Sequence, residues 1–353
     1  MKIQIKDTNI SKIQLPNKLG FGKFFTDRIF SQKYDPDKGW SQQKIAPAQE
    51  NFIPPTSQIF HNGQNIFEGI KAFLSKSGQI NVLRLNQHLE RFNKSAKRLC
   101  MPEIPLNLHS RAICQLLHAE KLWMPKKEGS SMYIRPVMIA IDQTFEVRSS
   151  EKFLHYIVLS PVDSFFDAPL APISVWICDE FVRAVRGGTG NIKTSANYAG
   201  SIFESERAKR NGYDQVLWLD ALERKYIEEV GAMNIMFVKN NDEIVTPKLN
   251  GSILPGITRG SIIELASSLK LKIKEEKLEV YRLLDEISSG IITECFAVGT
   301  AVTVVPINRL GFRNNEYKMH ATECGPITRR IYKKLVSIQQ GKLSIFQKWL
   351  TKI

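Results

Sequence analysis

The sequence predicts an α/β protein of two domains, and three observations support this prediction. The chain of 353 residues is longer than one compact domain usually is. Segments rich in β-branched and aromatic residues alternate with segments whose apolar residues recur at helical spacing. Residues 162–172 contain two prolines and little periodicity, which indicates a linker. We therefore expect an N-terminal domain over 1–161 and a C-terminal domain over 173–353.

Four segments of the first domain predict β-strands, because each mixes β-branched and aromatic residues and ends in turn-forming residues. They are residues 57–74, 79–85, 131–141 and 153–162. Between them, residues 86–100 predict a helix with Asn86 as its N-cap and an apolar stripe along one side. The stripe consists of Leu89, Phe92, Ala96 and Leu99. Residues 107–123 predict a second helix.

The second domain is predicted to alternate strands and helices after the linker. A strand is expected first, then a loop that leads into a helix, which Gly212 ends. A pair of strands resembling a hairpin follows, and a long helix closes the chain. In order, these are residues 173–179, 198–212, 214–221, 225–239 and 326–342, with a turn at 240–242.

Composition indicates a soluble cytoplasmic protein without a metal site. Hydrophobic residues make up 43% and charged residues 24%, which is ordinary for a globular domain. No stretch approaches the roughly 20 uninterrupted apolar residues that span a bilayer. The first residues lack an apolar core for secretion, and Asp7 argues against a transit peptide. Five scattered cysteines predict neither a disulfide framework nor a zinc site, and they fit a reducing compartment.

The formal net charge of +14 raises the question of nucleic-acid binding. However, the lysines and arginines are spread along the chain, and no run of five or six basic residues occurs. Zinc-finger spacings are absent as well. We therefore expect the charge to lie on solvated faces, with no nucleic-acid partner and no membrane partner.

The segment Arg186–Gly200, RGGTGNIKTSANYAG, places a lysine after a glycine-rich turn. A phosphate-binding loop needs glycine directly before the Lys-Thr pair, but Ile192 stands there. The three glycines before it, at 187, 188 and 190, do not fit the dinucleotide fingerprint G-x-G-x-x-G. Both nucleotide-binding interpretations are therefore rejected.

Two interpretations of Lys193 then stay open from the residues alone. A lysine that forms a Schiff base must lose its proton near neutral pH, and a nearby helix N-terminus lowers its pKa. Tyr198 could supply a phenol that hydrogen-bonds an aromatic hydroxyl of a cofactor. The alternative is a surface turn rich in small residues.

The segment GGTGNIKTSANYA resembles the active-site lysine segment of branched-chain-amino-acid aminotransferases, which are pyridoxal 5′-phosphate enzymes of fold type IV. The resemblance continues in order along nearly the whole chain, through HNGQNIFEGIKAF, YIRPVM, QVLWLDA, EEVGAMN, ILPGITRG and FAVGTAVTVVPI. It implies a small α/β N-terminal domain, a larger C-terminal domain with a barrel-like sheet, and a site at the domain junction. It also implies a homodimer in which a loop of the neighbouring subunit completes the site.

The resemblance implies a role for each cofactor-binding residue. Lys193 would form the Schiff base and move a proton between the substrate Cα and the cofactor, while Tyr198 would bond the cofactor O3′. Glu229 would face the pyridine nitrogen and keep it protonated, with Glu228 as the alternative in register. Arg84 would clamp the phosphate with its planar fork. The phosphate site would be completed by Gly256, Ile257, Thr258 and Thr300.

The same resemblance implies substrates and the residues that bind them. The expected reaction exchanges an amino group between Leu, Ile or Val and 2-oxoglutarate, giving glutamate. The carboxylates would be bound at Tyr133, Arg135, Thr300 and Ala301, and the apolar wall would include Phe25 and Phe67. Two alternatives stay open: another fold type IV enzyme (a D-amino-acid aminotransferase or aminodeoxychorismate lyase), and a catalytically silent or basic binding protein.

This sequence departs from the family pattern at a few positions. Asn62 replaces an aromatic residue expected near the substrate, and Arg28 stands where histidine is frequent. Ser195 and Ala196 replace two glycines after the lysine, so their side chains restrict the backbone there. The Cys-x-x-Cys of some animal members is absent at 302–305, so redox control of that kind is not expected.

Overall fold

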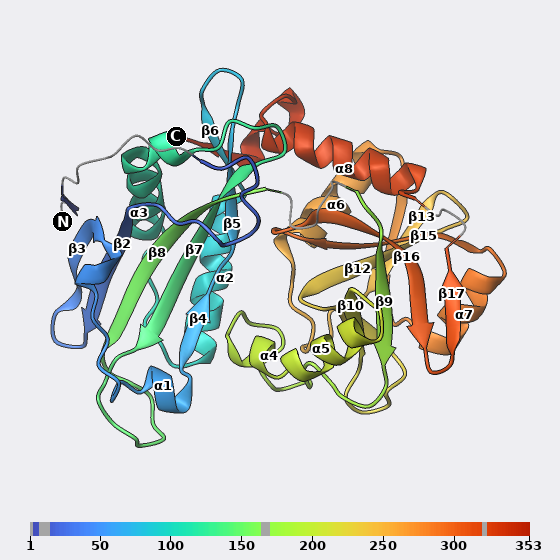
Figure 1. Ribbon diagram of the computed structural model, residues 1–353, viewed down its shortest axis with the longest axis horizontal. Helices are drawn as coiled ribbons and strands as arrows, with labels where there is room; N and C mark the ends of the chain where they lie inside the picture. The colour runs from blue at the N-terminus through green and yellow to red at the C-terminus, as the bar shows by residue number, and fades with distance from the viewer. Residues whose placement is uncertain (1–2, 7–14, 164–169, 320–322) are drawn as a thin grey trace. The chain divides into compact units, whose positions relative to one another are not determined.

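The computed structural model describes residues 3–6, 15–163, 170–319 and 323–353 (Figure 1). The chain divides into two compact units. Unit 1 takes in Met1–Phe165, Ile192–Ser195 and Ser337–Ile353, and unit 2 takes in Phe166–Asn191 and Ala196–Val336. Two segments placed in the second domain by the sequence prediction, around Lys193 and at the C-terminus, thus belong to unit 1. Within the predicted linker 162–172, residues 164–169 lie outside the described residues.

Unit 1 is built on a nine-stranded sheet of its described residues, with a largely antiparallel order. The strand order is β1-β3-β2-β8-β7-β5-β6-β18, and β4 pairs with β7. Their bounds are β1 Gln4–Ile5, β2 Arg28–Asp35, β3 Gly39–Pro47, β4 Asn65–Phe67, β5 Ile70–Leu74, β6 Ile80–Leu83, β7 Ser131–Ala140, β8 Phe153–Val162 and β18 Leu350–Lys352. The C-terminal strand therefore closes one edge of the first sheet by pairing antiparallel with β6.

Helices α2 Leu85–Arg98 and α3 Leu106–Ala119 cover one face of this sheet. The predicted apolar stripe of α2 is confirmed, because Leu89, Phe92 and Ala96 are completely buried. On β7, Met132 and Ile134 belong to the same core. Successive side chains of a strand point to opposite faces, so Tyr133 and Arg135 project from the face away from these helices.

Some local predictions for unit 1 are wrong. The predicted strand over 57–74 begins instead with a helical turn, α1 Ile59–Asn62, which Gly63 ends in the left-handed conformation at φ 66°. Helix α2 begins at Leu85, so Asn86 is not its N-cap; Arg84 holds that position, with φ 49°. The predicted helix 107–123 ends at Ala119, and a short 3-10 turn, η2 Lys121–Trp123, follows. Strands β2 and β3 were not predicted.

Unit 2 contains a closed, barrel-like sheet. Strand β11 pairs with both β10 and β12, so that β9, β10, β11, β12, β15 and β16 form a ring. Strands β13, β14 and β17 extend the sheet. The bounds are β9 Ile173–Cys178, β10 Gln215–Leu219, β11 Ile227–Val230, β12 Met233–Lys239, β13 Glu243–Pro247, β14 Lys272–Glu276, β15 Ile292–Gly299, β16 Thr303–Phe312 and β17 Asn315–Lys318. The predicted strand 214–221 corresponds to β10, but the predicted strand 225–239 is divided into β11 and β12, which pair antiparallel with each other. The expected antiparallel pairing is made by β10 and β11.

The helices with residues in unit 2 are α4 Ala196–Ala199, α5 Ile202–Arg210, α6 Ile257–Ser268, α7 Val280–Ser288 and α8 Pro326–Gln339. The predicted helix 198–212 is therefore divided into α4 and α5. Its predicted stop is confirmed, since Gly212 follows α5 with φ 78°. Among the described helices, none is both long enough and apolar enough to cross a membrane.

Arg28, one of the departures from the family pattern, is a packing residue of unit 1. It is buried, its Nε lies 2.5 Å from Oε1 of Glu120, and its Nη2 donates to the Ala119 carbonyl at 2.8 Å. Burial raises the pKa of Glu120, against the opposing effect of the Arg28 charge. Arg28 therefore ties the start of β2 to the end of α3.

Candidate active site

Unit 1 holds the backbone of the Lys193 segment through three hydrogen bonds, two at Lys193 and one at Ser195. The Lys193 N–H donates to Ser95 Oγ of α2 at 3.1 Å, and the Lys193 carbonyl accepts from the Phe67 N–H of β4 at 3.0 Å. Two residues on, the Ser195 N–H donates to Asn65 Oδ1 at 3.1 Å. Ser95 Oγ in turn donates to the Arg91 carbonyl at 3.0 Å. The lysine is thus presented by a segment anchored on both sides of it.

The Lys193 side chain lies among residues predicted to bind substrate. Its Nζ is 4.9 Å from the centroid of the Phe67 ring, and Arg135 Cζ is 4.6 Å from the same centroid. Arg135 Nη2 also donates to the Tyr133 hydroxyl at 3.1 Å. The structure therefore brings together four predicted site residues within unit 1. Phe25, another residue predicted to bind substrate, is 55% exposed.

Sequence reasoning missed two neighbours of Tyr133. Lys71 of β5 lies directly opposite Tyr133 of β7, so the two side chains share a face of the sheet. Lys71 is buried, and burial lowers its pKa to about 8. The Phe21 ring packs edge-on against Tyr133 at 4.8 Å. The available signal was a lysine inside the apolar strand IKAFL, since buried lysines are rare.

A buried ionic network lies close to Lys193. Arg91 donates to both carboxylate oxygens of Glu68, from Nε at 2.6 Å and from Nη2 at 2.9 Å, and His88 Nδ1 lies 3.0 Å from Oε2. Burial opposes ionisation of Glu68, but the Arg91 charge and the hydrogen bonds outweigh it and hold the pKa of Glu68 well below its usual range. Burial lowers the pKa of His88, and the charges of Arg91 and Lys193 add to this effect.

Arg84 is fixed by the C-terminal segment of unit 1. Its guanidinium stacks on the Trp349 ring, with Cζ 3.8 Å from the centroid, and its backbone N–H donates to the Trp349 carbonyl at 2.6 Å. Its Nη1 donates to Gln87 Oε1 at 2.9 Å. The sequence did not indicate Trp349, because it is far from Arg84 along the chain. The stacked guanidinium has a fixed plane, as bidentate binding of a phosphate requires.

In unit 2, the two adjacent glutamates of β11 have separate partners. Glu229 is 2% exposed; Arg183 Nη2 lies 2.5 Å from its Oε2, and Asn234 Nδ2 donates to its Oε1 at 3.1 Å. Glu228 accepts from Asn250 Nδ2 at 2.8 Å and from Ser252 Oγ. Arg183 was not predicted from the sequence. Its charge favours the ionised form of the Glu229 carboxyl.

Asn234 connects Glu229 to the start of helix α6. Its Nδ2 also donates to the Leu254 carbonyl at 3.0 Å, two residues before the N-cap Gly256. The predicted helix start is confirmed, because α6 begins at Ile257. A Cβ added to Gly256 would overlap Asn234 Oδ1. Thr258 in the first turn is buried, and both Thr300 and Ala301, just after β15, are half-buried.

The structure also shows where the rest of the Lys193 segment lies, together with the residues at which this chain departs from the family pattern. Thr189 Oγ1 donates to Asn197 Oδ1 at 2.7 Å, and Asn197 Nδ2 donates to the Thr189 carbonyl at 2.8 Å. Ser195 and Ala196 are both exposed, and α4 begins at Ala196. Tyr198 is half-buried on α4. Asn62 donates to the Glu146 carbonyl at 2.7 Å, and so contacts the loop between β7 and β8.

Comparisons with known proteins identify the family of this fold and site. The family model for amino-transferase class IV matches residues 65–310, which is more than half of the chain. The chain therefore belongs to the class IV aminotransferases. A relative named branched-chain-amino-acid transaminase 1, from Bacillus subtilis, is 41% identical over 339 residues, covering 96% of this chain and 95% of the relative. A probable branched-chain-amino-acid aminotransferase of Staphylococcus aureus is 42% identical over 339 residues, covering 95% and 94%.

Solved structures share the fold. The Escherichia coli branched-chain amino acid aminotransferase aligns with a TM-score of 0.77 at 24% identity, covering 92% of this chain and 98% of that one. The enzyme from Thermobaculum terrenum, solved in its PLP-form, aligns with a TM-score of 0.76 at 23% identity, covering 93% and 98%. The predicted two-part α/β fold with a barrel-like sheet is confirmed.

Proposed function

We propose that the chain catalyses transamination between branched-chain L-amino acids and 2-oxoglutarate, giving branched-chain 2-oxo acids and L-glutamate. The observation that carries this proposal is the near-full-length similarity to relatives named for branched-chain substrates. The proposed reaction is a ping-pong exchange of two half-reactions, one for each substrate. Residues of both units support this function.

The cofactor is pyridoxal 5′-phosphate, as in other class IV aminotransferases. When bound, it supplies a carbonyl carbon that takes up the amino group and a ring that withdraws electrons from the substrate Cα. The charged and hydrogen-bonding groups of this structure fit the cofactor. Unit 2 offers the buried Glu229 carboxylate with its arginine partner. It also offers the start of α6, where a side chain at Gly256 would not fit. Unit 1 offers a lysine on an anchored segment and a stacked arginine.

Lys193 is assigned the covalent bond to the cofactor and the proton transfer. Lys193 Nζ would bind the cofactor covalently and, when free, would take up the proton of the substrate Cα and hold it for return. This proton transfer needs the Lys193 amine within reach of the substrate Cα. The hydrogen bonds from Lys193 to Ser95 and Phe67 support the assignment, because they fix the backbone from which Nζ projects.

Glu229 is assigned to the ring nitrogen of the cofactor, where a carboxylate would accept a hydrogen bond and favour the protonated ring. Arg183 and Asn234 support this role by holding the carboxylate ionised and in one orientation. Tyr198 is assigned to the O3′ hydroxyl of the ring. The phosphate is assigned to Arg84, the first N–H groups of α6 at Ile257 and Thr258, and the Thr300 hydroxyl.

The substrate carboxylates are assigned to Tyr133, Arg135 and the Thr300–Ala301 turn, and the aliphatic chain to a wall that includes Phe67 and Phe25. The contact between the Tyr133 hydroxyl and the Arg135 guanidinium supports this assignment, because it presents one donor-rich edge. The Phe67 ring beside Arg135 supplies an apolar surface next to that edge. Such a pair of surfaces can accept either an aliphatic chain or the second carboxylate of glutamate.

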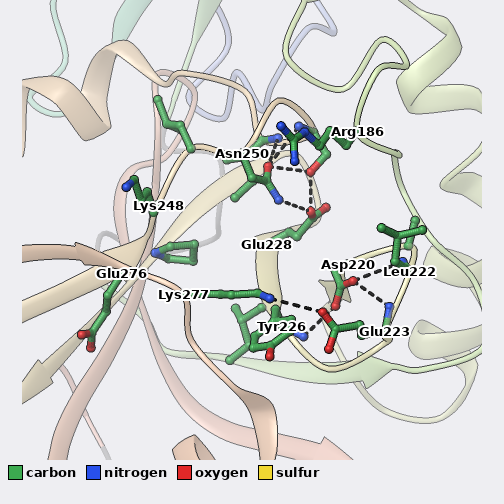
Figure 2. Close-up of a pocket in the computed structure, with 16 residues that line it drawn as sticks. Arg186, Asp220, Leu222, Glu223, Tyr226, Glu228, Lys248, Asn250, Glu276 and Lys277 are labelled. Atoms are coloured by element: carbon green, nitrogen blue, oxygen red, sulfur yellow. Dashed lines mark hydrogen bonds and ion pairs between the residues drawn. The ribbon is translucent and has the colours of Figure 1, made fainter.

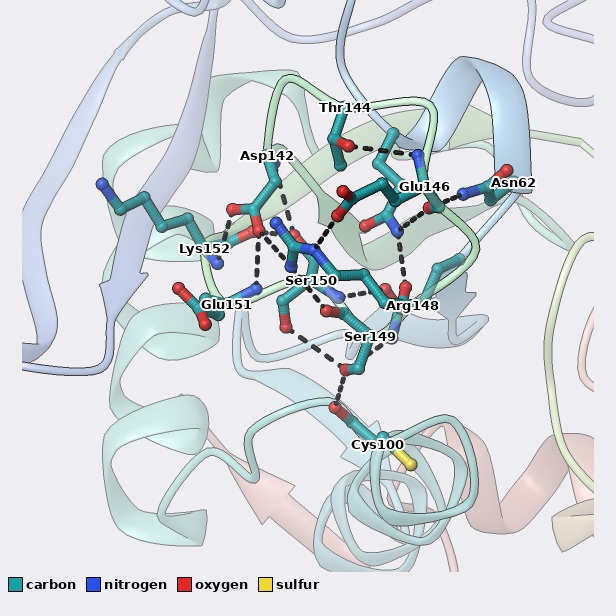
Figure 3. A network of polar contacts seen from close by, with 12 residues as sticks. Asn62, Cys100, Asp142, Thr144, Glu146, Arg148, Ser149, Ser150, Glu151 and Lys152 are labelled. Atoms are coloured by element: carbon teal, nitrogen blue, oxygen red, sulfur yellow. Dashed lines mark hydrogen bonds and ion pairs between the residues drawn. The ribbon is translucent and has the colours of Figure 1, made fainter.

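We infer a homodimer from the loop between β7 and β8. Figure 3 shows this loop held by a polar network, in which Arg148 Nη1 lies 3.0 Å from Asp142 Oδ2 and Asn62 donates to the Glu146 carbonyl. Gln58 also donates to a loop carbonyl, that of Arg148, at 2.5 Å. Although the loop is fixed in this way, it leaves Phe145 71% and Val147 93% exposed. Two apolar side chains on a rigid loop fit burial in a second copy of the chain.

We propose a cytoplasmic location because the cysteines are free thiols. All five lie in the described part of the chain and are free thiols. Three of them, Cys178, Cys295 and Cys324, are buried, and burial raises the pKa of each thiol. Such thiols are stable in a reducing compartment.

Substitution of Gly256 by alanine is expected to weaken cofactor binding by about tenfold or more, since the new Cβ displaces Asn234 and breaks its bond to Glu229. The matched control is Gly260→Ala on the same helix, where an added Cβ meets nothing within 4 Å. Absorbance titration of each apoenzyme with pyridoxal 5′-phosphate measures the effect. Equal affinity in the two variants would contradict the proposed link between Asn234 and the cofactor.

The proposed substrate class is tested by initial rates with L-leucine, L-isoleucine, L-valine and D-alanine, each with 2-oxoglutarate. The three branched-chain L-amino acids are expected to react far faster than D-alanine. D-alanine as the better substrate would replace the proposal by a D-amino-acid aminotransferase. Purified protein that binds no cofactor and turns over none of the four would indicate a silent relative.

A further inference from the structure

Unit 2 contains a cavity of about 540 Å³ that the proposed reaction does not use (Figure 2). Residues after β10, before and on β11, and after β13 and β14 line it. Glu228 belongs to its lining, and we call it the Glu228 cavity. Among the described residues, none of those proposed for the cofactor or the substrate lines it. Its volume falls within the range of small-molecule sites in proteins.

Glu228 brings an incompletely satisfied carboxylate to this cavity. Its side chain is buried, with 3% exposed, and Oε1 accepts from Asn250 and Ser252. Oε2 is also buried, but it accepts no hydrogen bond from any residue that the structure describes. A buried carboxylate oxygen without a donor costs free energy, and a charged donor satisfies it best. The cavity therefore offers a place for an ammonium group.

Three other charged residues of the lining, Asp220, Glu223 and Lys277, are already paired. The Asp220 carboxylate accepts four backbone N–H groups, from Leu222, Glu223, Lys225 and Tyr226. Lys277 Nζ lies 3.2 Å from Glu223 and 3.4 Å from the centroid of the Tyr226 ring. These groups have partners within the fold. They leave Glu228 as the carboxylate with an open position.

Two cations of the lining, Arg186 and Lys248, form no ion pair with a described residue. Arg186 lies next to the turn that holds Glu228, because its Cγ is 3.6 Å from where a Cβ on Gly251 would stand. Figure 2 shows Arg186 beside Asn250, which donates to Glu228. A carboxylate bound near Arg186 would thus lie close to an ammonium bound at Glu228.

The lining of the cavity also includes aliphatic side chains. Leu222 is 84% exposed and Leu249 is 38% exposed, and Ile253 of the same lining is buried. Exposed leucines beside a polar pocket provide a surface for an aliphatic group. Ammonium, carboxylate and aliphatic side chain are the three parts of an aliphatic α-amino acid.

We propose that the Glu228 cavity binds a free aliphatic α-amino acid at a second, non-catalytic site. Its ammonium donates to Glu228 Oε2, its carboxylate is bound by Arg186, and its side chain packs on Leu222 and Leu249. No bond is made or broken there. The proposal depends on the geometry of unit 2, and it does not depend on which substrates the enzyme transaminates.

The test is isothermal titration calorimetry of L-leucine into the borohydride-reduced holoenzyme, in which the cofactor is fixed and turnover is blocked. Wild-type protein is expected to bind L-leucine, and Glu228→Gln and Arg186→Ala are each expected to weaken binding by about tenfold or more. The control is Glu276→Gln, a change to another carboxylate of the lining that has a lysine partner at 3.9 Å. It should bind L-leucine within about twofold of wild type.

Two matched ligands and one structure complete the test. Isopentylamine lacks the carboxylate and 4-methylpentanoate lacks the ammonium, so Glu228→Gln should weaken the first and leave the second unchanged. A crystal of the reduced enzyme soaked in L-leucine should show the ammonium at Glu228 Oε2. The proposal is overturned if Glu228→Gln and Arg186→Ala both bind L-leucine as wild type does, or if the soaked crystal shows only water there. Arg186 is exposed, so its variant stays informative even if Glu228→Gln fails to fold.

Discussion

Replacing Lys193 by alanine is expected to lower kcat for L-leucine transamination by at least about 10³-fold, since the change removes both the covalent link and the proton carrier. Cofactor binding should persist in part, because Arg84, Glu229 and the α6 start are untouched by the substitution. The visible absorbance of the protein-bound cofactor is expected to change, since the bond to Nζ can no longer form. A stopped-flow single-turnover assay separates this chemical defect from weaker substrate binding.

The matched control for this change is Lys209→Ala, at an exposed lysine of α5. It should leave kcat within about twofold of wild type, as surface substitutions usually do. If the Lys193 variant kept a tenth or more of the wild-type rate, the assignment of proton transfer to this lysine would be contradicted.

Replacing Glu229 by glutamine is expected to lower kcat on the order of 10²-fold, because a neutral amide stabilises the charge on the ring nitrogen far less than a carboxylate does. The side chain keeps its size, and its Oε1 can still accept from Asn234. Arg183 then loses its anionic partner in a buried place, so a loss of stability accompanies the change. The two effects differ in their readout, since stability is measured by thermal melting and catalysis by kcat at a temperature where both proteins are folded.

Glu243→Gln is the control for Glu229→Gln. Glu243 lies on β13 of the same sheet and pairs with the exposed Lys274 at 2.6 Å. Its loss should change kcat by less than about twofold, because surface ion pairs contribute little. Equal rates in wild type and Glu229→Gln would contradict the assignment of this carboxylate to the ring.

Local patterns predicted the parts of the fold that depend on local physics. The stripe of Leu89, Phe92 and Ala96 predicts α2 because a 3.6-residue period needs one buried side. Gly212 predicts the end of α5 because glycine adopts a positive φ without strain. The N-cap of α2 was missed because Arg84, stacked on Trp349, takes a left-handed conformation that few side chains adopt.

For the site, the sequence predicted single residues but not the contacts that hold them in place. Resemblance to a family assigned roles to Lys193, Arg84 and Glu229 one residue at a time. It did not indicate the partners that hold them, namely Ser95, Trp349 and Arg183, because each of these contacts joins residues brought together only by folding. Lys71 was missed for a related reason, since the register between β5 and β7 places it opposite Tyr133.

The position of the covalent link identifies the Schiff-base lysine. The holoenzyme is reduced with borohydride, digested, and its peptides are sequenced by mass spectrometry. We predict a single pyridoxyl-modified peptide with the added mass on Lys193, and none on Lys71, which is also buried and has a lowered pKa. Modification of Lys71 or of any other lysine in place of Lys193, or cofactor that stays unattached, would contradict the assignment of the covalent bond to Lys193.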